Sequence, residues 1–404
     1  MSKTKHKWVK FRHKVVRVLF GPFFYLGAKI KYHAEIEKYT GDKNKPVIVL
    51  FNHVTAYDQF FVSLSFKRHI YYVAIEDLFT KGFISSLLRF LVAPIPIKKH
   101  STDLKALKSI VNVAKEGGSI GIAPEGNRTY SGRTCSMKDT VSNLCMMLKL
   151  PIVLYLIEGG YGVQPRWSDK VRKGRMRCRI ARVIEPEEYL SWSKEELYEV
   201  IKNTLTIDEA KDDARFVSKR SAEFLERAMY VCPDCGLSVF ESKGEYIKCQ
   251  KCDKKIKYNE DTSLSGVGFD FPYKFVADWY DHQEKFVNEL DLLNMSEESL
   301  YEDEVEIYDV EPAKRKKLLS PNAVLKLYAG GVKIKIPDKT TVDIPFRLVK
   351  GSACVGNNKL NIEYDGRLYL FKGNERFNPL KYVNFYYRYN NLIKGDEDGK
   401  FLGL

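Results

Sequence analysis

The sequence predicts an α/β domain with a mixed sheet flanked by helices, followed by a small four-cysteine module and a β-rich C-terminal domain. In residues 31–205, short apolar runs typical of strands alternate with stretches of helical periodicity. Two C-x2-C pairs follow, and from residue 321 the apolar residues recur at every second position, as in strands. A chain of 404 residues also exceeds what one compact core usually holds, so two or three domains are expected.

Within the α/β domain, predicted strands and helices follow one another along the chain. Strands are predicted at 47–51, 70–74, 119–123, 152–157 and 178–184. Helices are predicted at 58–65, at 84–91, from 101 or 102 to a stop at Gly117-Gly118, and after a capping box formed by Ser193 and Glu196. The helix at 84–91 is richer in apolar residues than its length requires, which favours either core packing or a role in lining an apolar groove.

The charge balance indicates an anionic partner. Lysine and arginine number 66 against 52 for aspartate and glutamate, which gives a net charge of +14 and a pI near 9.1. Such an excess is typical of proteins that meet a lipid surface, nucleic acid or a phosphorylated substrate, and composition does not choose among the three. The eight cysteines comprise two close pairs and four scattered residues. This distribution indicates a reducing, cytosolic compartment and a metal site.

The first 30 residues are predicted to form a basic amphipathic segment that lies in a membrane interface. Seven basic residues fall within the first 17 positions, before the first acidic residue, Glu35, and they would attract anionic headgroups. The apolar run 18–28 is shorter than the about 20 residues that a spanning helix needs, and Gly21-Pro22 is expected to break it. A helix docked on the core is the alternative, but the aromatic residues favour the interface. We therefore expect a peripheral or monotopic protein on the cytoplasmic face of a membrane.

A histidine and an aspartate mark the candidate catalytic centre. The strand that ends at Phe51 runs into Asn52 and His53, and Asp58 follows five residues later. Within one helix that spacing would separate the two side chains by about 140°, so His53 is expected in the loop and Asp58 in the first turn of the next helix. There the carboxylate can hold one imidazole nitrogen and leave the other to accept a proton from a hydroxyl. Since such a spacing more often gives a purely structural pair, the pair alone does not establish catalysis.

Further motifs place this pair in a known family. Asn52-His53-x4-Asp58 is followed by Ala93-Pro-Ile-Pro-Ile-Lys-Lys99, by Ala123-Pro-Glu-Gly-Asn-Arg-Thr129 and by Leu150-Pro-Ile-Val-Leu-Tyr-Leu156. In this order the motifs resemble the four blocks of the glycerolipid acyltransferases of the lysophosphatidate acyltransferase type. The resemblance covers roughly residues 15–205, about half of the chain.

The resemblance implies a reaction and a set of roles. An acyl group would pass from acyl-CoA or acyl carrier protein to the free hydroxyl of 1-acyl-sn-glycerol-3-phosphate, with His53 as general base and Asp58 orienting it. The residues implied in binding the substrate phosphate are Lys99, Glu125, Gly126, Asn127 and Arg128.

Two departures from the family pattern leave the acceptor open. Lys99 stands where the family usually has arginine, and Asn127 where it usually has threonine. Lysine lacks the bidentate fork of arginine. Glycerol-3-phosphate or another lipid alcohol is therefore the alternative acceptor, and a tight turn without chemistry is the alternative interpretation of the third block.

Residues 206–230 are predicted to form a charged linker helix and residues 231–258 a zinc ribbon. Thirteen residues separate the pair Cys232 and Cys235 from the pair Cys249 and Cys252, a spacing typical of a four-thiolate zinc site. Four thiolates leave no position for water, so the zinc should be structural. Zinc ribbons often bind nucleic acid, which makes a nucleic-acid-binding protein the rival hypothesis. The acyltransferase blocks and the acidic stretch 284–311 argue against nucleic acid as a partner.

The C-terminal third is predicted to be an acidic linker followed by a β-rich domain. Residues 259–320 are expected to form a solvated linker or an exposed helix, because acidic residues dominate 284–311. In 321–404, alternating runs flank Gly330-Gly331 and Asp365-Gly366, which indicates two hairpins. Pro379 then opens an amphipathic helix. Strands followed by one helix resemble a pleckstrin-homology-like barrel, a likeness of topology that fits lipid-headgroup binding, protein docking or a stabilising role.

Overall fold

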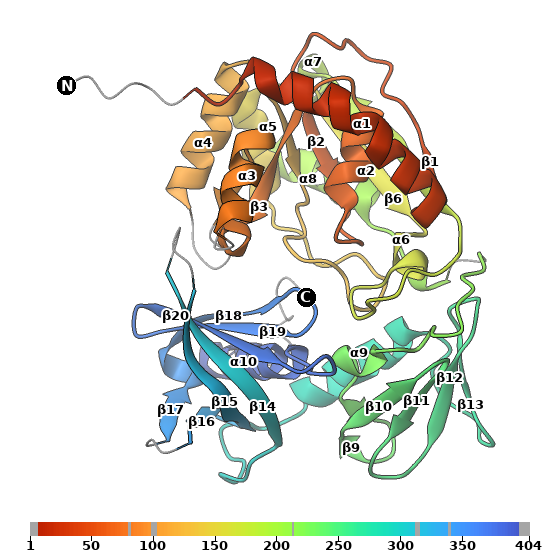
Figure 1. Ribbon diagram of the computed structural model, residues 1–404, viewed down its shortest axis with the longest axis vertical. Coiled ribbons are helices and arrows are strands. Elements are labelled where there is room, and N and C mark those ends of the chain that lie inside the picture. Colours follow the sequence, from red (N-terminus) through yellow and green to blue (C-terminus); the bar gives the residue numbers. More distant parts are fainter. Residues whose placement is uncertain are drawn as a thin grey trace. The chain divides into compact units, whose positions relative to one another are not determined.

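The computed structural model describes residues 7–79, 82–97, 103–211, 214–311, 316–337 and 341–395. These residues divide into two compact units (Figure 1). Unit 1 contains the described residues up to Pro165 together with Val171–Phe216, and unit 2 contains Arg166–Lys170 together with the described residues from Val217 onward. The division near residue 216 falls within the stretch predicted to be a linker helix.

Unit 1 is built on a seven-stranded mixed sheet in the order β1-β7-β6-β2-β5-β3-β4. Neighbouring strands are parallel except for β6 and β7, which run antiparallel. The strands are β1 (Ala34–Ile36), β2 (Ile48–Phe51), β3 (Ile70–Ile75), β4 (Ile95–Ile97), β5 (Ser119–Ile122), β6 (Ile152–Glu158) and β7 (Met176–Ile184). All five predicted strands are present. The structure adds β1 and β4, which at three residues each are too short for a periodic pattern.

Helices cover both faces of this sheet (Figure 1). On one face lie α1 (Phe11–Tyr32) and α2 (Asp58–Ser65), and on the other lie α4 (Leu104–Lys115), α5 (Thr140–Leu148) and α8 (Lys194–Leu205). In β2, Val49 and Phe51 pack toward α2, whereas Ile48 and Leu50 pack toward α5 and α8. Burial on both faces explains why the sequence of β2 is an unbroken apolar run. The shorter helical segments of unit 1 are η1 (Glu76–Phe79), α3 (Phe83–Leu91), α6 (Gly160–Val163), α7 (Pro186–Tyr189) and η2 (Glu209–Lys211).

Helix α1 continues through Gly21 and Pro22, so the predicted break is wrong. Proline inside a helix removes one backbone hydrogen bond and crowds the preceding turn. Beyond the proline, Ala28 and Tyr32 are buried in the core of unit 1. Because tertiary packing supplies most of the stability of a helix in a protein, this anchorage is enough to keep the helix continuous.

The predicted linker helix at 206–230 is also wrong for the described residues of that stretch. They contain only the 3₁₀ turns η2 and η3 (Leu225–Arg227). Residues 221–232 are all buried, including the charged Glu226 and Arg227. Charged residues can be buried when they are paired with other groups. Their presence makes the sequence of a core segment resemble that of a solvated one.

Unit 2 joins small antiparallel sheets that carry the four cysteines to a larger antiparallel sheet. The small sheets consist of β8 (Val231–Cys232), β9 (Gly236–Leu237), β10 (Phe240–Lys243), β11 (Tyr246–Cys249), β12 (Lys255–Tyr258) and β13 (Leu264–Gly266). Helix α9 (Val276–Asn288) follows them. The larger sheet has the order β17-β16-β15-β14-β20-β19-β18. Its strands are β14 (Tyr301–Val310), β15 (Lys317–Tyr328), β16 (Gly331–Lys335), β17 (Val342–Pro345), β18 (Val349–Val355), β19 (Lys359–Tyr364) and β20 (Arg367–Gly373).

Both predicted hairpins are confirmed. Tyr328 of β15 pairs with Gly331 of β16, and Tyr364 of β19 pairs with Arg367 of β20. Asp365 and Gly366 both have positive φ, which the tight turn between β19 and β20 requires. The two edge strands, β17 and β18, are joined through η4 (Phe346–Leu348), and α10 (Leu380–Lys394) follows the last strand with Pro379 at its N-cap, as predicted. This is a β-rich domain with one terminal helix; its likeness to a pleckstrin-homology-like barrel stays a prediction.

The acidic linker predicted at 259–320 is wrong for the described residues. Helix α9 lies inside this range, and β14 lies in the middle of the larger sheet between β15 and β20. In β14, Val305 and Ile307 point into the core, while Glu302 and Glu306 form ion pairs with lysines of the neighbouring strands. Glu302 and Glu306 therefore lie on the outer face of a central strand.

Candidate active site and metal centre

Three parallel strands bring the first and third sequence blocks to one edge of the sheet. Strand β2 lies between β5 and β6 and runs parallel to both, so all three end at the same edge. His53 follows β2, and Glu125 follows β5. The side chain of Asn52 donates to the Ile157 carbonyl at 2.9 Å and accepts from the Ile157 N–H at 2.8 Å, which fixes the end of β2 against β6.

His53 and Asp58 are in contact, as predicted. His53 lies in the loop, Asp58 is the first residue of α2, and His53 Nδ1 is 2.7 Å from Asp58 Oδ2. Asp58 is fully buried, whereas 26% of the His53 side chain is exposed. A carboxylate at a helix N-terminus is favoured by the helix dipole. Because an ionised carboxylate only accepts hydrogen bonds, Nδ1 carries the hydrogen and Nε2 is the nitrogen that can accept a proton.

Asp58 has further donors that hold it in one orientation. The Val54 N–H donates to it at 2.8 Å, the Thr55 N–H at 2.9 Å and the Thr55 hydroxyl at 2.6 Å. Thr55 is a residue of this site that the sequence analysis missed. Little in the sequence signals it, because Thr55 stands three positions before the helix start, outside the N-cap position that such hydroxyl residues favour.

In the third block, the side chain of Glu125 is buried, whereas Gly126 at the tip of the turn is exposed. Glu125 is 4% exposed; its Oε1 accepts from the His53 N–H at 2.7 Å and its Oε2 from the Cys135 N–H at 2.8 Å. Desolvation by burial raises the pKa of Glu125 to about 8, and the nearby charge of Asp58 acts in the same direction. Gly126, by contrast, is exposed with φ +71°, a conformation suited to glycine, and has open space around its Cα.

The remaining predicted binding residues lie next to this turn or outside the described part. Asn127 and Arg128 directly follow Gly126 and are partly buried. Lys99 lies outside the described residues. The structure thus brings His53, Asp58 and the third block together, whereas the second block is described only up to Ile97 in β4.

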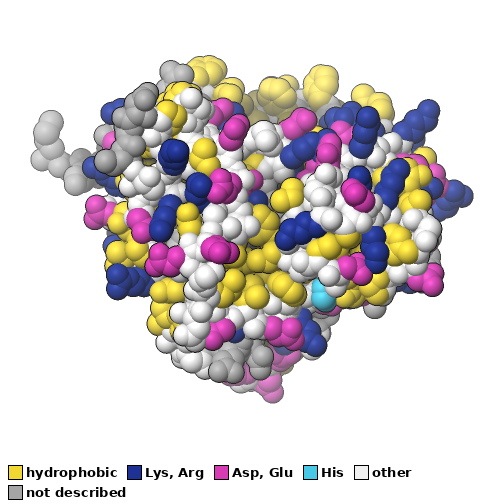
Figure 2. Space-filling view, turned by 90° about the horizontal axis from the view of Figure 1, so that it is seen from below, with side chains coloured by type: hydrophobic (Ala, Val, Ile, Leu, Met, Phe, Trp, Pro, Cys, Tyr) yellow, Lys and Arg dark blue, Asp and Glu magenta, His cyan; other side chains and the backbone are white. Residues whose placement is uncertain are grey.

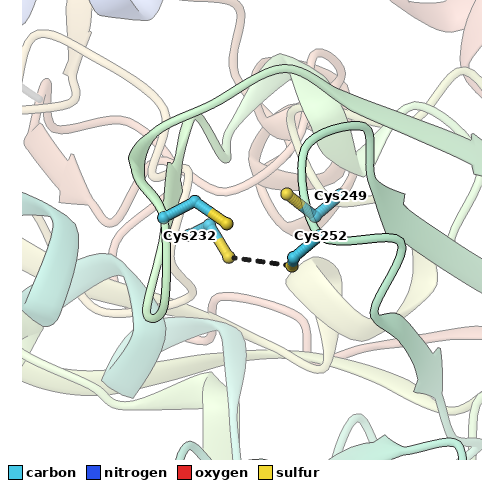
Figure 3. Close-up of side chains that lie close together, drawn as sticks. Cys232, Cys249 and Cys252 are labelled. Carbon is cyan, nitrogen blue, oxygen red and sulfur yellow. Dashed lines mark hydrogen bonds between the residues drawn. The ribbon is translucent and has the colours of Figure 1, made fainter.

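The four cysteines of unit 2 form a cluster. The sulfur atoms of Cys232, Cys235, Cys249 and Cys252 all lie within 4.8 Å of one another. Figure 3 shows Cys232, Cys249 and Cys252 pointing toward a common centre, with the Sγ atoms of Cys232 and Cys252 3.8 Å apart. Four sulfurs at about 2.3 Å from a zinc ion would be about 3.8 Å apart along each edge of a tetrahedron. The cluster therefore fits a tetrahedral metal ion.

Each cysteine pair lies on a tight turn that ends in a left-handed residue. Gly236 follows Cys235 with φ +68°, and Asp253 follows Cys252 with φ +60°. A Cβ atom at Gly236 would lie 3.0 Å from the ring of Phe286, a tight contact, and the positive φ favours glycine there. These turns bring both sulfurs of each pair to the same side.

Unit 1 also carries an exposed apolar surface made by α1 and α3. Arg12 joins the two helices, because its Nε donates to the Phe90 carbonyl at 2.9 Å and its guanidinium lies 4.1 Å from the centre of the Phe90 ring. Among the residues that the structure describes, no helix is long and apolar enough to cross a membrane. The large exposed apolar residues of the two helices are Phe11, Val15, Val18, Leu19, Phe20, Phe23, Phe24, Leu26, Ile30, Phe83, Ile84, Leu87 and Phe90.

A comparison with protein families found a match within unit 1. A mixed α/β sheet with a His–Asp pair at its carboxyl edge is the arrangement that the motifs predicted. Residues 29–157 match the family described as Acyltransferase. This part of the chain is therefore similar to the acyltransferase family, and the resemblance inferred from the motifs is confirmed.

Two individual proteins are similar to parts of the chain. The 1-acyl-sn-glycerol-3-phosphate acyltransferase of Bacillus subtilis (strain 168) is 26% identical over 120 residues, which are 30% of this chain and 57% of that protein. The chain thus spans little more than half the length of this relative. The crystal structure of the 1-acyl-sn-glycerophosphate (LPA) acyltransferase PlsC from Thermotoga maritima aligns with a TM-score of 0.39 and 20% identity, over 49% of this chain and 80% of that one.

Proposed function

We propose that this protein is an O-acyltransferase that moves a fatty acyl group from acyl-CoA or acyl carrier protein to the free hydroxyl of 1-acyl-sn-glycerol-3-phosphate. The observation that carries the proposal is the His53–Asp58 pair at the edge of the sheet, with Nδ1 engaged and Nε2 left to accept a proton. The third block beside it and the match to the acyltransferase family support the same activity.

The proposed mechanism is direct transfer with His53 as general base. His53 Nε2 takes the proton of the acceptor hydroxyl as the hydroxyl oxygen attacks the thioester carbonyl carbon. Asp58 stabilises the imidazolium that forms. The tetrahedral intermediate then collapses, the carbon–sulfur bond breaks, and the leaving thiolate takes the proton from His53 to leave as a thiol. A cysteine nucleophile is not needed; burial raises the pKa of Cys145 to about 12, so this thiol stays protonated at neutral pH.

The test is acyl transfer by the purified full-length protein. Labelled acyl-CoA and acyl carrier protein are each offered with 1-acyl-sn-glycerol-3-phosphate, glycerol-3-phosphate and uncharged lipid alcohols. The proposal expects 1-acyl-sn-glycerol-3-phosphate to give the highest kcat/KM. Transfer to glycerol-3-phosphate or to another alcohol instead would retain the enzyme class and replace the acceptor. Absence of transfer with every pair would remove the proposal.

The rival function, nucleic-acid binding through the cysteine module, has less support. Binding of this kind depends on a basic face, often with bases stacking on aromatic rings. On the face of the molecule shown in Figure 2, acidic and basic side chains are interspersed around a group of apolar ones. Within the module, Lys254 pairs with Asp234, Lys248 with Asp253 and Lys257 with Glu245. These pairs reduce the positive charge that a phosphate backbone would meet.

We propose that Lys99, Gly126, Asn127 and Arg128 hold the acceptor phosphate, with Arg128 as a main cation. Arg128→Ala is then expected to raise the acceptor KM by about 10- to 100-fold, because a charge-assisted hydrogen bond contributes about 1.5–3 kcal/mol. The donor KM should change less, and Lys99→Ala should behave in the same way. Steady-state kinetics with a phosphate-bearing and an uncharged acceptor provide the measurement. An equal loss with both acceptors would contradict a phosphate-binding role.

We also propose that unit 1 associates with an anionic membrane through the surface of α1 and α3, as a peripheral or monotopic protein on the cytoplasmic face. Leu19, Phe23, Leu26 and Ile30 are all exposed and lie within about 60° of one another around the helix axis. The cations Lys14, Lys29 and Lys31 lie exposed on the same helix. An apolar face bordered by cations is the pattern of interfacial helices.

Three substitutions test this surface more sharply than a deletion of residues 1–30, which would also remove the buried His13 and Ala28. The triple variant Leu19→Ser, Phe23→Ser, Ile30→Ser is expected to bind anionic vesicles at least about 100-fold more weakly, because each lost side chain removes about 2 kcal/mol of burial. High salt should weaken binding of the unaltered protein as well. Leu318→Ser, at an exposed apolar residue of unit 2, is the control. Equal vesicle partitioning of the triple variant and the control would remove the membrane proposal.

We propose a structural zinc ion for the four-cysteine cluster. Four thiolates would fill its coordination and leave no site for water or substrate, so the ion would hold the fold and take no part in acyl transfer. The proposed catalytic segment remains 31–205 and the proposed zinc ribbon 231–258.

A further inference from the structure

The main chain of His53 is held on both sides by the third sequence block. Its N–H donates to Glu125 Oε1 at 2.7 Å, and its carbonyl accepts from the Thr129 N–H at 3.2 Å. The other oxygen of Glu125 accepts from the Cys135 N–H at 2.8 Å. One carboxyl group thus connects the loop after β2, the turn after β5 and the segment leading to α5. The hydrogen bonds of Asp58 reach the His53 ring and the two residues after His53, and not the His53 main chain.

The position of Glu125 does not suit a ligand of the acceptor phosphate. Its side chain is 4% exposed, and each of its oxygens already accepts a backbone N–H. The outward part of the same turn, Gly126, has open space around it and is where an acceptor can approach.

We propose that Glu125 is a positioning residue that fixes the backbone of His53, and that it does not contact the acceptor as the sequence resemblance implied. The proposal rests on the function of His53 as general base. Asp58 sets the orientation of the imidazole, and Glu125 sets the position of the backbone that carries the imidazole. Both are needed, because a displacement of about 1 Å at a reacting group can cost about 100-fold in rate.

The test is Glu125→Gln, assayed with acyl donor and 1-acyl-sn-glycerol-3-phosphate. Glutamine has nearly the same shape but can accept only one of the two N–H groups, because its amide nitrogen is a donor. We expect kcat to fall by about 100-fold with the acceptor KM within about twofold, since no acceptor contact is lost. A rise in the acceptor KM at unchanged kcat would overturn the proposal and restore Glu125 as a substrate ligand.

A matched variant separates positioning from a general loss of structure. Glu209 is another buried glutamate of unit 1, and it accepts the Tyr161 N–H at 2.6 Å. Glu209→Gln makes the same substitution at a buried site away from His53, and it is expected to leave kcat within about threefold of the unaltered enzyme. Equal losses of kcat in the two variants would reduce Glu125 to a structural role and contradict the proposal.

The pH dependence of stability gives a second readout that needs no substrate. The groups facing Glu125 are Asp58, His53 and Cys135. Because the folded pKa is raised to about 8, the stability from this carboxyl is present below its ordinary pKa near 4.5 and is lost as pH rises through about 8. Glu125→Gln should remove this loss, so its unfolding midpoint should change less between pH 6 and 9. A slope equal to that of the unaltered protein would place the carboxyl outside this buried cluster.

The outcomes also distinguish this proposal from the proposed function. If His53→Ala remained active, the base assignment would fail whatever Glu125→Gln did. If His53→Ala were inactive and Glu125→Gln changed only the acceptor KM, the function would stand and the positioning proposal would fall.

Discussion

Replacement of His53 by alanine is expected to lower acyl transfer by on the order of 10³-fold or more while leaving unit 1 folded. The reaction requires removal of a hydroxyl proton, and His53 Nε2 is the proposed acceptor. The fold should survive because the ring is partly exposed and hydrogen-bonds to Asp58. Without the ring, Asp58 still accepts from Val54 and Thr55, so its buried charge stays compensated.

The measurement is kcat/KM at saturating donor, together with the thermal unfolding midpoint. A midpoint within a few degrees of the unaltered protein would show that lost activity is lost chemistry. A folded His53→Ala protein with full activity would refute the mechanism and return nucleic-acid binding to first place.

Asp58→Asn provides the informative contrast. An amide can still bond to the ring but no longer stabilises the imidazolium or enforces the tautomer, so activity should fall severely. Unlike His53, Asp58 is fully buried and accepts from several donors. The amide nitrogen of asparagine would face one or more of these N–H groups and leave them unsatisfied. This variant should therefore lose stability as well as activity, which His53→Ala should not.

The sequence predicted the features that depend on local chemistry. The range 58–65 of α2 agrees with the structure residue for residue, because Asp58 at the start of an apolar periodic stretch is a strong helix-start signal. Ser193 and Glu196 form the predicted capping box of α8, and Asp365-Gly366 forms the predicted hairpin turn. The spacing of the cysteines predicted the cluster. In each case the determining residues lie within a few positions of one another.

The missed features depend on partners far away in the chain. The carboxyl group of Glu125 is held inside the protein by two distant N–H groups, and nothing adjacent to it in the sequence signals this. The acidic residues of β14 pair with Lys326 and Lys372 on neighbouring strands, so local charge suggested a solvated linker. Glu226 is buried and paired with Arg376. Pattern reasoning treats a charge as exposed unless its partner is near in sequence.

Removal of the metal is expected to affect unit 2 more broadly than the ribbon alone. The segment that leads into Cys232 is bonded to three other elements of unit 2. Gln283 of α9 accepts from the Tyr230 N–H at 2.7 Å, Tyr301 of β14 donates to the Tyr230 carbonyl at 2.8 Å, and Asn384 of α10 donates to the Tyr230 hydroxyl at 2.7 Å. These groups are all buried. Loss of the ribbon's shape would leave them without partners in the interior, where each unsatisfied group costs about 1–3 kcal/mol.

We therefore expect one tightly held zinc per chain, and loss of the ribbon's fold together with a lower unfolding midpoint of unit 2 on chelation or in Cys232→Ser. The binding free energy of a structural zinc site is on the order of 10 kcal/mol, comparable with the stability of a whole domain. Elemental analysis and hydrogen exchange at residues 276–288 and 380–394 provide the measurements. Cys354→Ala, at a buried cysteine of β18 outside the cluster, should keep its zinc.

Loss of the metal should lower the rate of acyl transfer less than it lowers the stability of the ribbon, because His53 and Asp58 belong to unit 1. Absence of metal, or iron in place of zinc, would contradict the assignment. If the metal is lost and exchange increases in the ribbon but not in α9 and α10, the zinc holds a local module. Increased exchange in all three would instead show that residues 230–232 couple the metal to the β-rich part of the unit through the hydrogen bonds of Tyr230.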